Sequence, residues 1–435
     1  MADIVTSRIF VDGEKGITAA KLNDIVASSV IQPSFYTSKP TASTADPTDV
    51  MLILKSGAYT QVPISTVTSG MDASQIWSVR LRSFNAVGNP NFEVDQRTGG
   101  NGTSLNTGFA QDRWILQTTG TMDVLAQLLS VPPVAIPGTN FPISQCCLRV
   151  TLNTQQATLG AGDNLWITQN VEGINLRELI SDVHSVSLLV RSSVAGLTFG
   201  FGLMDDSSTH SLLKLCTIPT ANTWILITLP NLPVWLAAAT WNLAPGFRGY
   251  QIFISLGSGS TYTAPANDTW QNGLFVGAAG QSNFSSNPVN STFDIAFVQH
   301  EPGPVCSTLM DKPFTGANGN LEECLRYYQK SHPYGITPGT AIGTRQLGQV
   351  LTGGTAARLS FAFPKQMAKT PTLTLYDASG AINAVYVDNW GDHVSVTGVT
   401  ADSSGPLNAA TFPTAVGAAA YAYPINGNWV ADTGW

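Results

Sequence analysis

The side chains best suited to chemistry in this sequence are aromatic residues that stand beside amides and carboxylates in turn-like segments. They occur in the segments GDNLWITQN and STYTAPANDTWQNG. An aromatic ring stacks on the C–H groups of a pyranose, and neighbouring amides and carboxylates hydrogen-bond to its hydroxyls. The same rings are also suited to a buried core or a subunit interface. The candidate sugar-binding residues are Asp163, Trp166, Tyr262, Asn267, Asp268 and Trp270.

A second candidate surface lies near the C-terminus, where tryptophans stand in or beside turn signals. The segments VDNWGDH and NGNWVADTGW contain Trp390, Trp429 and Trp435. Connecting turns run over the surface of a domain, which suits a ring that stacks on a ligand. Trp390 is therefore added to the candidate sugar-binding residues.

Other chemistries find little support in the residue pattern. The histidines, at positions 184, 210, 300, 332 and 393, lack the sequence spacing of metal ligands. The sequence contains no nucleophile elbow, phosphate-binding loop or dinucleotide fingerprint. We therefore expect no metal, no cofactor and no catalytic residue.

Carboxylate pairs keep glycoside hydrolysis open as an alternative. This reaction requires two carboxyl groups at a set separation, and Glu172, Glu178, Asp205 and Asp206 are available. The chain shows no repeats of a long parallel β-helix. Asp205 and Asp206, in LMDDSSTH, fit a solvated hairpin turn better than an acid/base pair. Binding is therefore favoured over catalysis.

Composition predicts a β-rich protein that binds no nucleic acid. Charged residues make up only 11% of the 435 residues, and the formal net charge is −7 without any basic run. Nucleic-acid binding needs a basic surface that neutralises phosphates. No apolar stretch approaches the ~18 residues of a membrane span, and the N-terminus lacks the pattern of a secretory signal. We expect a chain that folds in the cytosol and does not insert into a membrane.

The cysteines fit the same compartment. There are 5 of them, an odd number, and none forms the C-x-x-C spacing of a metal site. Cys146 and Cys147 are adjacent and would point to opposite faces of a strand. We expect reduced, mostly buried cysteines, with a disulfide framework as the less favoured alternative.

Residues 1–75 differ in pattern from the remainder. The segment ITAAKLNDIVASSV predicts a short amphipathic helix whose apolar face includes Ile17, Leu22, Ile25 and Val26. The segment VMLILKSGAYTQVPISTV predicts a hairpin around Lys55-Ser56-Gly57. A helix and a hairpin bury too little apolar area to be stable alone. This segment therefore requires a partner, either copies of itself or another protein.

Short strands bounded by Gly, Ser, Asn and Pro fill the rest of the chain. Residues 76–305 predict a jelly-roll β-sandwich, because no long helices separate the strands; NLRELISDVHS is the one helical or irregular connection expected. Residues 336–435 show period-2 alternation with turn signals and predict a smaller β-sandwich.

The segment LEECLRYYQKSH predicts a helix over 319–331 within a linking region, 306–335. Leu321, Cys324, Leu325 and Tyr328 fall on one helical stripe, opposite the charged residues. Such a stripe suits a helix that covers the open end of a sandwich and joins two domains. No catalytic role follows from it.

Several of these segments together resemble bacteriophage tail-fibre proteins. The resemblance runs from about residue 85 to 435 and is carried by NPNFEVDQRTGG, FAQDRWILQTTGT, FDIAFVQHEPGPVCSTLMDKPFTGANGNLEECLRYYQKSH, QMAKTPTLTLYDASG and YAYPINGNWVADTGW in that order. Separately, FVDGEKGITAAKLNDIV is similar to the opening segment by which phage fibres and spikes attach to the particle.

The resemblance implies a structural virion protein, a tail-fibre or receptor-binding protein that attaches to host surface glycans. It implies a homotrimer on the phage particle, a jelly roll of the carbohydrate-binding-module type, and an N-terminal virion anchor that includes Ile17, Leu22, Ile25 and Val26. Other virion proteins and a host glycan are the implied partners. The alternatives are a capsid-decorating head fibre or a tail collar protein without a dedicated receptor, and a glycan-cleaving tail enzyme.

Overall fold

The computed structural model describes residues 50–55, 58–63, 84–99, 103–104, 107–139, 142–180, 183–309, 319–343, 345–350, 357–389, 392–397, 401–402, 408–411 and 424–435. The chain divides into two compact units, Met1–Asp72 and Ala73–Trp435. The predicted helix with Ile17, Leu22, Ile25 and Val26 lies outside the described residues, and so does Trp390. Their proposed roles stay predictions.

The first unit contains the predicted hairpin. Strands β1 (Val50–Lys55) and β2 (Ala58–Pro63) pair antiparallel, and Lys55 is opposite Ala58. Only Ser56 and Gly57 connect the two strands, which is the loop length that favours a tight hairpin turn. This prediction is confirmed.

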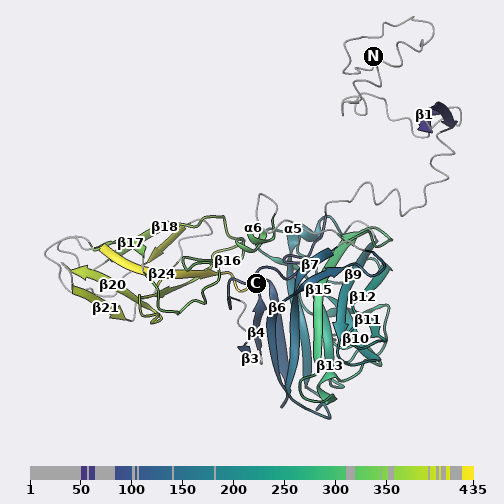
Figure 1. The fold of residues 1–435 in the computed structure, drawn as a ribbon, viewed down its shortest axis with the longest axis horizontal. Helices are drawn as coiled ribbons and strands as arrows, with labels where there is room; N and C mark the ends of the chain where they lie inside the picture. Colours follow the sequence, from purple (N-terminus) through teal and green to yellow (C-terminus); the bar gives the residue numbers. More distant parts are fainter. Residues whose placement is uncertain are drawn as a thin grey trace, which may run out of the picture. The chain divides into compact units, whose positions relative to one another are not determined.

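The second unit begins with a sandwich of two antiparallel sheets (Figure 1). In the described part of the chain, one sheet has the order β14 (Trp270–Asn272), β11 (His210–Ile218), β10 (Leu197–Asp205), β13 (Arg248–Ser258), β8 (Asn164–Glu172), β5 (Trp114–Thr119) and β4 (Thr107–Gln111). The other has the order β12 (Ile225–Leu232), β9 (His184–Ser192), β15 (Thr292–Pro302), β7 (Pro142–Thr154), β6 (Asp123–Ala135) and β3 (Thr103–Ser104). The predicted sandwich of residues 76–305 is confirmed at this level.

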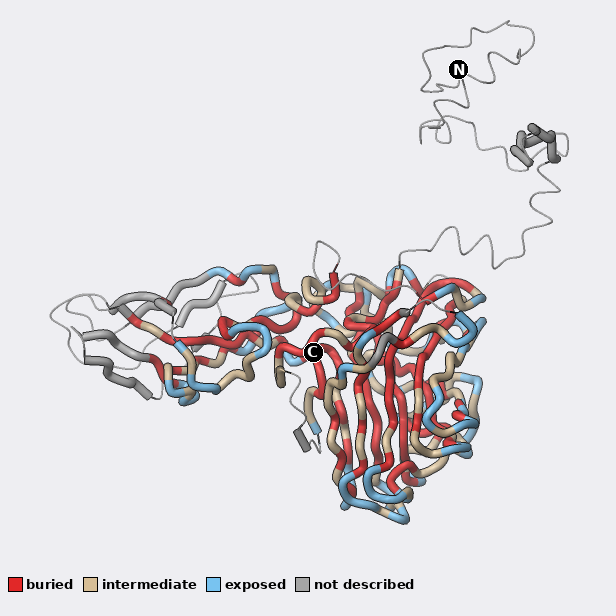
Figure 2. Tube along the Cα trace, in the orientation of Figure 1, coloured by how far each residue is buried: buried red, intermediate tan, exposed pale blue. Residues whose placement is uncertain are grey.

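The core lies between these sheets and follows from strand alternation. In β10, Phe199 and Phe201 point inward, and Ile254 of β13 is opposite Phe201. Trp114 is fully buried, stacks on Phe92 at 5.0 Å between ring centroids, and donates its indole N–H to the Asn89 carbonyl. Alternation of side chains in the strand sequence DRWILQ predicts that this indole faces the core, and the structure confirms it. Figure 2 shows the strands of the sandwich as largely buried, with exposure concentrated in the connections.

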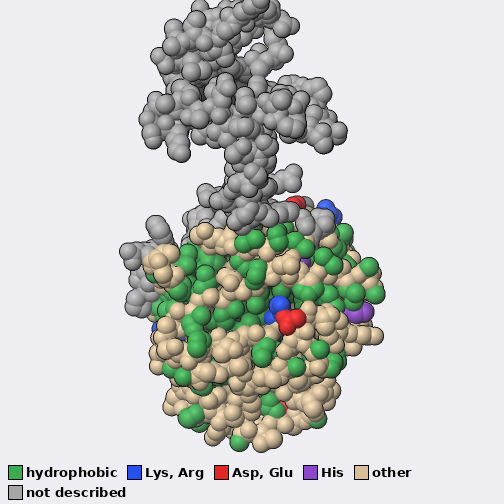
Figure 3. All heavy atoms as spheres, turned by 90° about the vertical axis from the view of Figure 1, so that its right-hand side faces the viewer, with side chains coloured by type: hydrophobic (Ala, Val, Ile, Leu, Met, Phe, Trp, Pro, Cys, Tyr) green, Lys and Arg blue, Asp and Glu red, His purple; other side chains and the backbone are tan. Residues whose placement is uncertain are grey.

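Few charged side chains are visible on the face of the sandwich in Figure 3, where most atoms belong to hydrophobic side chains, to other uncharged side chains or to the backbone. This surface agrees with the 11% charged residues of the sequence. All five cysteines are free, and Cys147 is buried whereas Cys146 is partly exposed, as expected for neighbours in a strand. Burial raises the pKa of the Cys147 thiol to about 12, so it stays protonated and unreactive.

Helices are short in the described residues: α5 (Gly173–Leu176), η1 (Phe284–Ser286) and α6 (Asn320–Cys324). The irregular connection after β8 was predicted. The predicted helix over 319–331 is wrong beyond Cys324, because β16 (Tyr328–Lys330) pairs antiparallel with β24 (Pro424–Asp432). Sheet pairing with a strand about a hundred residues later overrides the local helical spacing.

The remaining strands form a sheet around β24. They are β17 (Arg345–Val350), β18 (Ala357–Ala362), β19 (Thr372–Tyr376), β20 (Ala384–Asn389), β21 (Asp392–Thr397), β22 (Ala401–Asp402) and β23 (Asn408–Thr411). The first part of β24 pairs with β17 and β20, and its last part pairs with β16 and β19. The C-terminal region is therefore β-rich as predicted. Domain boundaries at 305 and 335 stay predictions.

The prediction of a solvated turn at Asp205 and Asp206 is half right. These residues connect β10 and β11, as expected of a hairpin turn. Asp205 is however fully buried, where its carboxylate accepts hydrogen bonds from the Thr209 and His210 backbone N–H groups. Burial raises the pKa of Asp205, but these and other hydrogen bonds outweigh burial and hold it at about 2. The Asp205 carboxylate therefore stabilises the turn by accepting hydrogen bonds from its backbone.

Candidate functional site

Two of the predicted sugar-binding aromatics lie together, but beneath a long connection. Trp166 stands in β8 on the outer face of its sheet, and Tyr262 packs in the same cluster. The Trp166 indole is only 8% exposed and meets Phe253 edge to face at 5.5 Å. The connection formed by segment 259–283 covers this cluster and contributes Ala264, Val276 and Ala278 to it. The structure therefore uses Trp166 for packing.

The predicted polar partners are engaged in loop hydrogen bonds. Asn267 exchanges two hydrogen bonds with the backbone of Ala279, and Asp163 accepts from the Gly160 N–H and from Gln156 Nε2. Asp268 forms an ion pair with Lys214. Trp270 lies elsewhere, in β14, and packs on Trp241 at 5.4 Å. The sequence-predicted residues thus divide into two clusters, and their sugar-binding role stays a prediction.

The spacing of histidines in the sequence does not reveal a buried histidine pair, which lies next to the cluster of Trp235, Trp241 and Trp270. His184 and His300 are fully buried, and Trp235 stacks on His184 at 4.5 Å. Tyr250 donates its hydroxyl to His300 Nδ1 at 2.7 Å, His300 Nε2 lies 2.9 Å from His184 Nδ1, and His184 Nε2 lies 3.2 Å from the Pro233 carbonyl. Two neutral imidazoles satisfy this chain with all protons pointing the same way. No third metal-binding side chain joins them among the described residues.

This pair predicts a loss of stability in mild acid. Burial lowers the pKa of His184 to about 4 and lowers that of His300 further, so the folded protein keeps both neutral. The unfolded chain takes up protons near pH 6.5, so stability is complete above that pH and falls as the pH drops towards 4, by at most about 1.4 kcal/mol per pH unit for each histidine.

Chemical unfolding between pH 7 and 4.5 measures this contribution. The stability difference between the native chain and His300→Gln is expected to shrink as the pH falls, because the variant has lost one of the groups responsible. His210→Gln, at a partly exposed histidine at the start of β11, serves as the control. A difference for His300→Gln that stays constant with pH contradicts the assignment.

The motif residues of the resemblance converge at one place in the structure. Tyr327 and Tyr328 are consecutive, so in extended chain their rings point to opposite sides. The Arg113 guanidinium lies 3.5 Å from the centroid of the Tyr327 ring, and the Arg97 guanidinium lies 4.1 Å from that of Tyr328. Each contact is a cation–π interaction. The segment RYYQK thus builds two different sites on its two sides.

The site on the Tyr328 side is a groove with a volume of about 460 Å³. Strand β24 runs between β16 and β19, and Asp432 is opposite both Tyr328 and Thr372. Alternation in β19 buries Leu373 and Leu375 and turns the other three residues to the groove. The groove is lined by Arg97, Tyr328, Thr337, Pro338, Thr372, Thr374, Tyr376, Val430, Asp432, Thr433 and Gly434.

The groove combines an aromatic ring with hydroxyl groups and a fixed carboxylate. Tyr376 is half-buried, and His332 holds its ring edge to face at 5.5 Å. Within the described part of the chain, the side-chain hydroxyls of Thr372, Thr374 and Tyr376 have no hydrogen-bond partner. Asp432 accepts from the Gly434 N–H at 2.7 Å and from Arg97 Nη2 at 2.9 Å, and its side chain is 28% exposed. These hydroxyls and this carboxylate are available to a ligand.

Buried charges hold the floor of the groove. Arg97 lies between Phe109 and Tyr328, and its Nε is 3.9 Å from an Asp112 carboxylate oxygen. Burial raises the pKa of Asp112 to about 7, against the opposing effect of Arg97. Lys330 donates to the carbonyls of Gln96, Tyr334 and Ile336 at 2.5–2.8 Å. Asp112 is only 1% exposed, so its carboxyl group lies next to Arg97 in the interior and does not face solvent.

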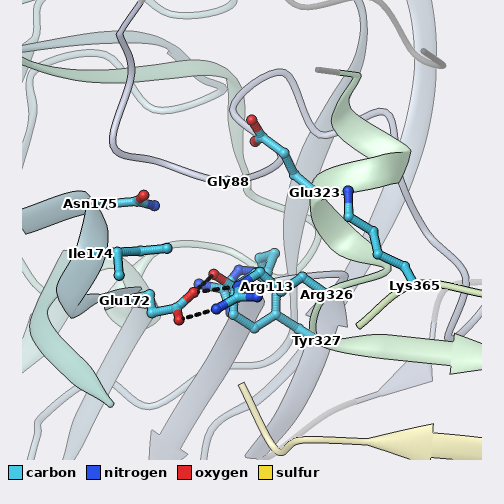
Figure 4. Close-up of a pocket in the computed structure, with 9 residues that line it drawn as sticks. All are labelled: Gly88, Arg113, Glu172, Ile174, Asn175, Glu323, Arg326, Tyr327 and Lys365. Carbon is cyan, nitrogen blue, oxygen red and sulfur yellow. Dashed lines mark hydrogen bonds and ion pairs between the residues drawn. The ribbon is translucent and has the colours of Figure 1, made fainter. Parts of the chain in front are cut away.

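The site on the Tyr327 side is a smaller, charged pocket of about 140 Å³ (Figure 4). Glu172 is fully buried there and accepts a bidentate pair of hydrogen bonds from Arg326 at 2.6 and 2.8 Å. The Tyr327 hydroxyl and the Gly246 N–H also donate to Glu172, each at 2.7 Å. Burial raises the pKa of Glu172, but these donors outweigh it and keep the carboxyl ionised.

Binding fits this chemistry better than hydrolysis does. Glycoside hydrolysis needs two carboxyl groups facing the sugar, and among the described residues that line the groove only Asp432 carries one. Glu172, one of the carboxylates considered from the sequence, is fully occupied by its four donors. At about 140 Å³, its pocket is also too small for the whole oligosaccharide that a glycosidase must hold across its scissile bond.

For three of the groove residues, the only signal in the sequence is that they belong to motifs of the resemblance. Arg97, Tyr328 and Asp432 stand in QRTGG, RYYQK and WVADTGW, all of which carry the resemblance. Arg97 and Asp432 are 335 residues apart, so no local pattern links them. The available signal was that these motifs hold charged and aromatic residues in a chain poor in charge.

Comparisons with known proteins identify no family. No family model matches the sequence, and no curated protein matches it. Among solved structures, TmCBM61 in complex with beta-1,4-galactotriose is similar at a TM-score of 0.27 and 12% identity, over 51% of this chain and 99% of that chain. The family 11 carbohydrate-binding module of a Clostridium thermocellum cellulase is similar at a TM-score of 0.25 and 10% identity, over 48% of this chain and 100% of that chain.

One further similar structure comes from a phage. The enzymatically active domain of tailspike protein 4 of bacteriophage CBA120 has a TM-score of 0.27 and 12% identity, over 50% of this chain and 21% of that chain. The match therefore spans about a fifth of the tailspike domain. At these TM-scores the similarities assign neither a fold family nor a function. In the described residues, no helix is long and apolar enough to cross a membrane.

Proposed function

We propose that this chain is a saccharide-binding attachment protein and that the groove between β16, β24 and β19 holds the sugar. The observation that carries the proposal is the groove itself, in which the half-buried Tyr376 ring lies beside the hydroxyls of Thr372 and Thr374 and the carboxylate of Asp432. Its volume of about 460 Å³ lies within the 300–1,000 Å³ of most small-ligand sites.

A saccharide matches these groups better than an apolar or strongly charged ligand does. A sugar presents C–H faces to an aromatic ring and hydroxyls to hydrogen-bonding side chains. The charges of Arg97 and Asp432 cancel in their ion pair. These two residues therefore give the groove no net charge that would attract an ion. A neutral sugar hydroxyl still finds a free lone pair on Asp432.

We further propose that the protein is a homotrimeric virion component that attaches a bacteriophage to host surface glycans. The sequence resemblance to tail-fibre proteins supports this extension, as does an N-terminal segment too small to be stable alone. Three weak sites on one particle would raise the effective affinity by roughly 10²–10⁴ through avidity. Sedimentation of the full chain tests the assembly, and a monomer at all concentrations contradicts it.

Binding of the full chain to neutral oligosaccharides tests the groove directly. On a glycan array and by calorimetry with the array's best ligand, Tyr376→Ala and Thr374→Val are each expected to weaken binding, by about tenfold for Tyr376→Ala, because this change removes the stacking face. Thr374→Val removes only a hydroxyl. Phe247→Ala is the matched control, since this aromatic side chain is 57% exposed and does not line the groove.

Two outcomes oppose the proposal. Absence of binding to every glycan by a folded full chain removes the function. Binding that survives both groove substitutions removes the site and returns attention to Trp241 and Trp270.

A further inference from the structure

We propose that the pocket lined by Arg113 on the other side of RYYQK binds the carboxylate of an acidic sugar. The pocket is distinct from the groove, because Tyr327 lines one and Tyr328 the other, and they share no lining residue. The proposal relies on the proposed function for the kind of molecule that brings the carboxylate.

The first step is that Arg113 is a buried cation for which the described part of the chain supplies no counter-ion. The residue is only 3% exposed, and its Nη2 donates to the Asn170 carbonyl. Its Nε and Nη1 are buried and have no hydrogen-bond partner among the described residues. No described carboxylate lies within 4.0 Å of this guanidinium. Burying an unpaired charge costs several kcal/mol. A bound anion would offset this desolvation cost by pairing with the guanidinium.

The second step is that this guanidinium borders an open space. Arg113 lines the cavity together with Gly88, Asn175, Glu323 and Lys365. A Cβ added to Gly88 would lie 3.3 Å from Arg113 Nε, so a glycine at this position keeps the space beside the buried guanidinium free of a side chain. Figure 4 shows Asn175 and Glu172 on one side of the pocket and Glu323 and Lys365 on the other. The volume of about 140 Å³ admits a carboxylate and part of a ring, but not a whole oligosaccharide.

The third step concerns the other charges of the pocket. Arg326 is matched by Glu172, and Lys365 lies 3.5 Å from Glu322. Arg113 remains as the cation without such a partner among the described lining residues. Glu172 and Glu323 also line the pocket and would repel a dianion such as phosphate. A planar monoanion on a planar guanidinium is the ligand group that fits.

Calorimetry on the full chain tests this with three probes: galacturonate, its neutral counterpart galactose, and acetate. We expect galacturonate to bind more tightly than galactose, and Arg113→Met to weaken galacturonate binding at least tenfold. Arg177→Met removes an exposed arginine and is expected to leave binding unchanged. Glu323→Gln is expected to strengthen binding, because it removes a repelling charge. Acetate bound through Arg113 without any galacturonate binding overturns the assignment to a sugar.

Two further measurements show whether a loss of binding comes from misfolding, and whether the pocket or the groove is responsible for binding. Thermal unfolding establishes that Arg113→Met is folded, and galacturonate is expected to raise the melting temperature of the native chain but not of this variant. Tyr376→Ala is expected to retain the Arg113-dependent binding. Galacturonate binding that Arg113→Met leaves intact and Tyr376→Ala abolishes overturns the pocket while leaving the groove in place. Galacturonate and galactose bound equally also overturn it.

Discussion

Replacing Glu172 by alanine is expected to lower the free energy of unfolding by about 3–5 kcal/mol. Glu172 is fully buried and receives hydrogen bonds from Arg326, Tyr327 and the Gly246 N–H. Its removal leaves the Arg326 guanidinium without a counter-ion and two further donors unsatisfied. Breaking one side of a buried ion pair costs more than the pair itself contributes, because the remaining charge stays desolvated.

The measurement is urea unfolding monitored by tryptophan fluorescence. Glu178→Ala is the matched control, since Glu178 is exposed, and it is expected to change stability by less than about 0.5 kcal/mol. Because Glu172 comes from the sandwich and Arg326 from the segment that leads to β16, the variant is also expected to separate one unfolding transition into two. Equal stabilities for Glu172→Ala and Glu178→Ala contradict the role given to this ion pair.

Replacing Arg97 by methionine is expected to cost a similar amount, about 3–5 kcal/mol, and to depend on pH. Arg97 holds Asp432 at the groove and is the cation nearest to Asp112 in the described part of the chain. Asp112 has its folded pKa raised to about 7, so its protonated form is favoured on folding. Its stabilising contribution is therefore complete below its ordinary value of 3.8 and is lost as the pH rises through 7.

Without Arg97, the ionised form of Asp112 becomes still less favourable. The destabilisation by Arg97→Met is therefore expected to be larger at pH 8 than at pH 5, as measured by urea unfolding at both values. Arg97→Lys keeps the charge but loses the two-pronged contact with Asp432, and we expect it to fall between the native chain and Arg97→Met. A loss for Arg97→Met that is the same at both pH values contradicts the pairing with Asp112.

The features that could be predicted from the sequence are those set by neighbouring residues. The hairpin of β1 and β2 follows from alternation around a two-residue loop, and the packing of Trp114 follows from its place in a strand. The sandwich follows from short strands without intervening helices. In each case the local pattern and the tertiary structure agree.

The candidate site could not be predicted in the same way. The spacing of Leu321, Cys324, Leu325 and Tyr328 fits a helix, and only pairing with β24 makes Tyr328 part of a strand. The loop aromatics Trp166 and Tyr262 look available in the sequence because nothing local shows that segment 259–283 folds over the sheet. The histidine pair was missed for the same reason, since His184 and His300 are 116 residues apart.

The most direct test of saccharide binding in the groove is a crystal structure of the full chain with the tightest-binding oligosaccharide from the array. We predict density for a sugar ring on the face of Tyr376, with hydroxyls within hydrogen-bond distance of Thr374 and Asp432. An empty groove with the oligosaccharide bound elsewhere, for example over Trp241 and Trp270, would contradict the account.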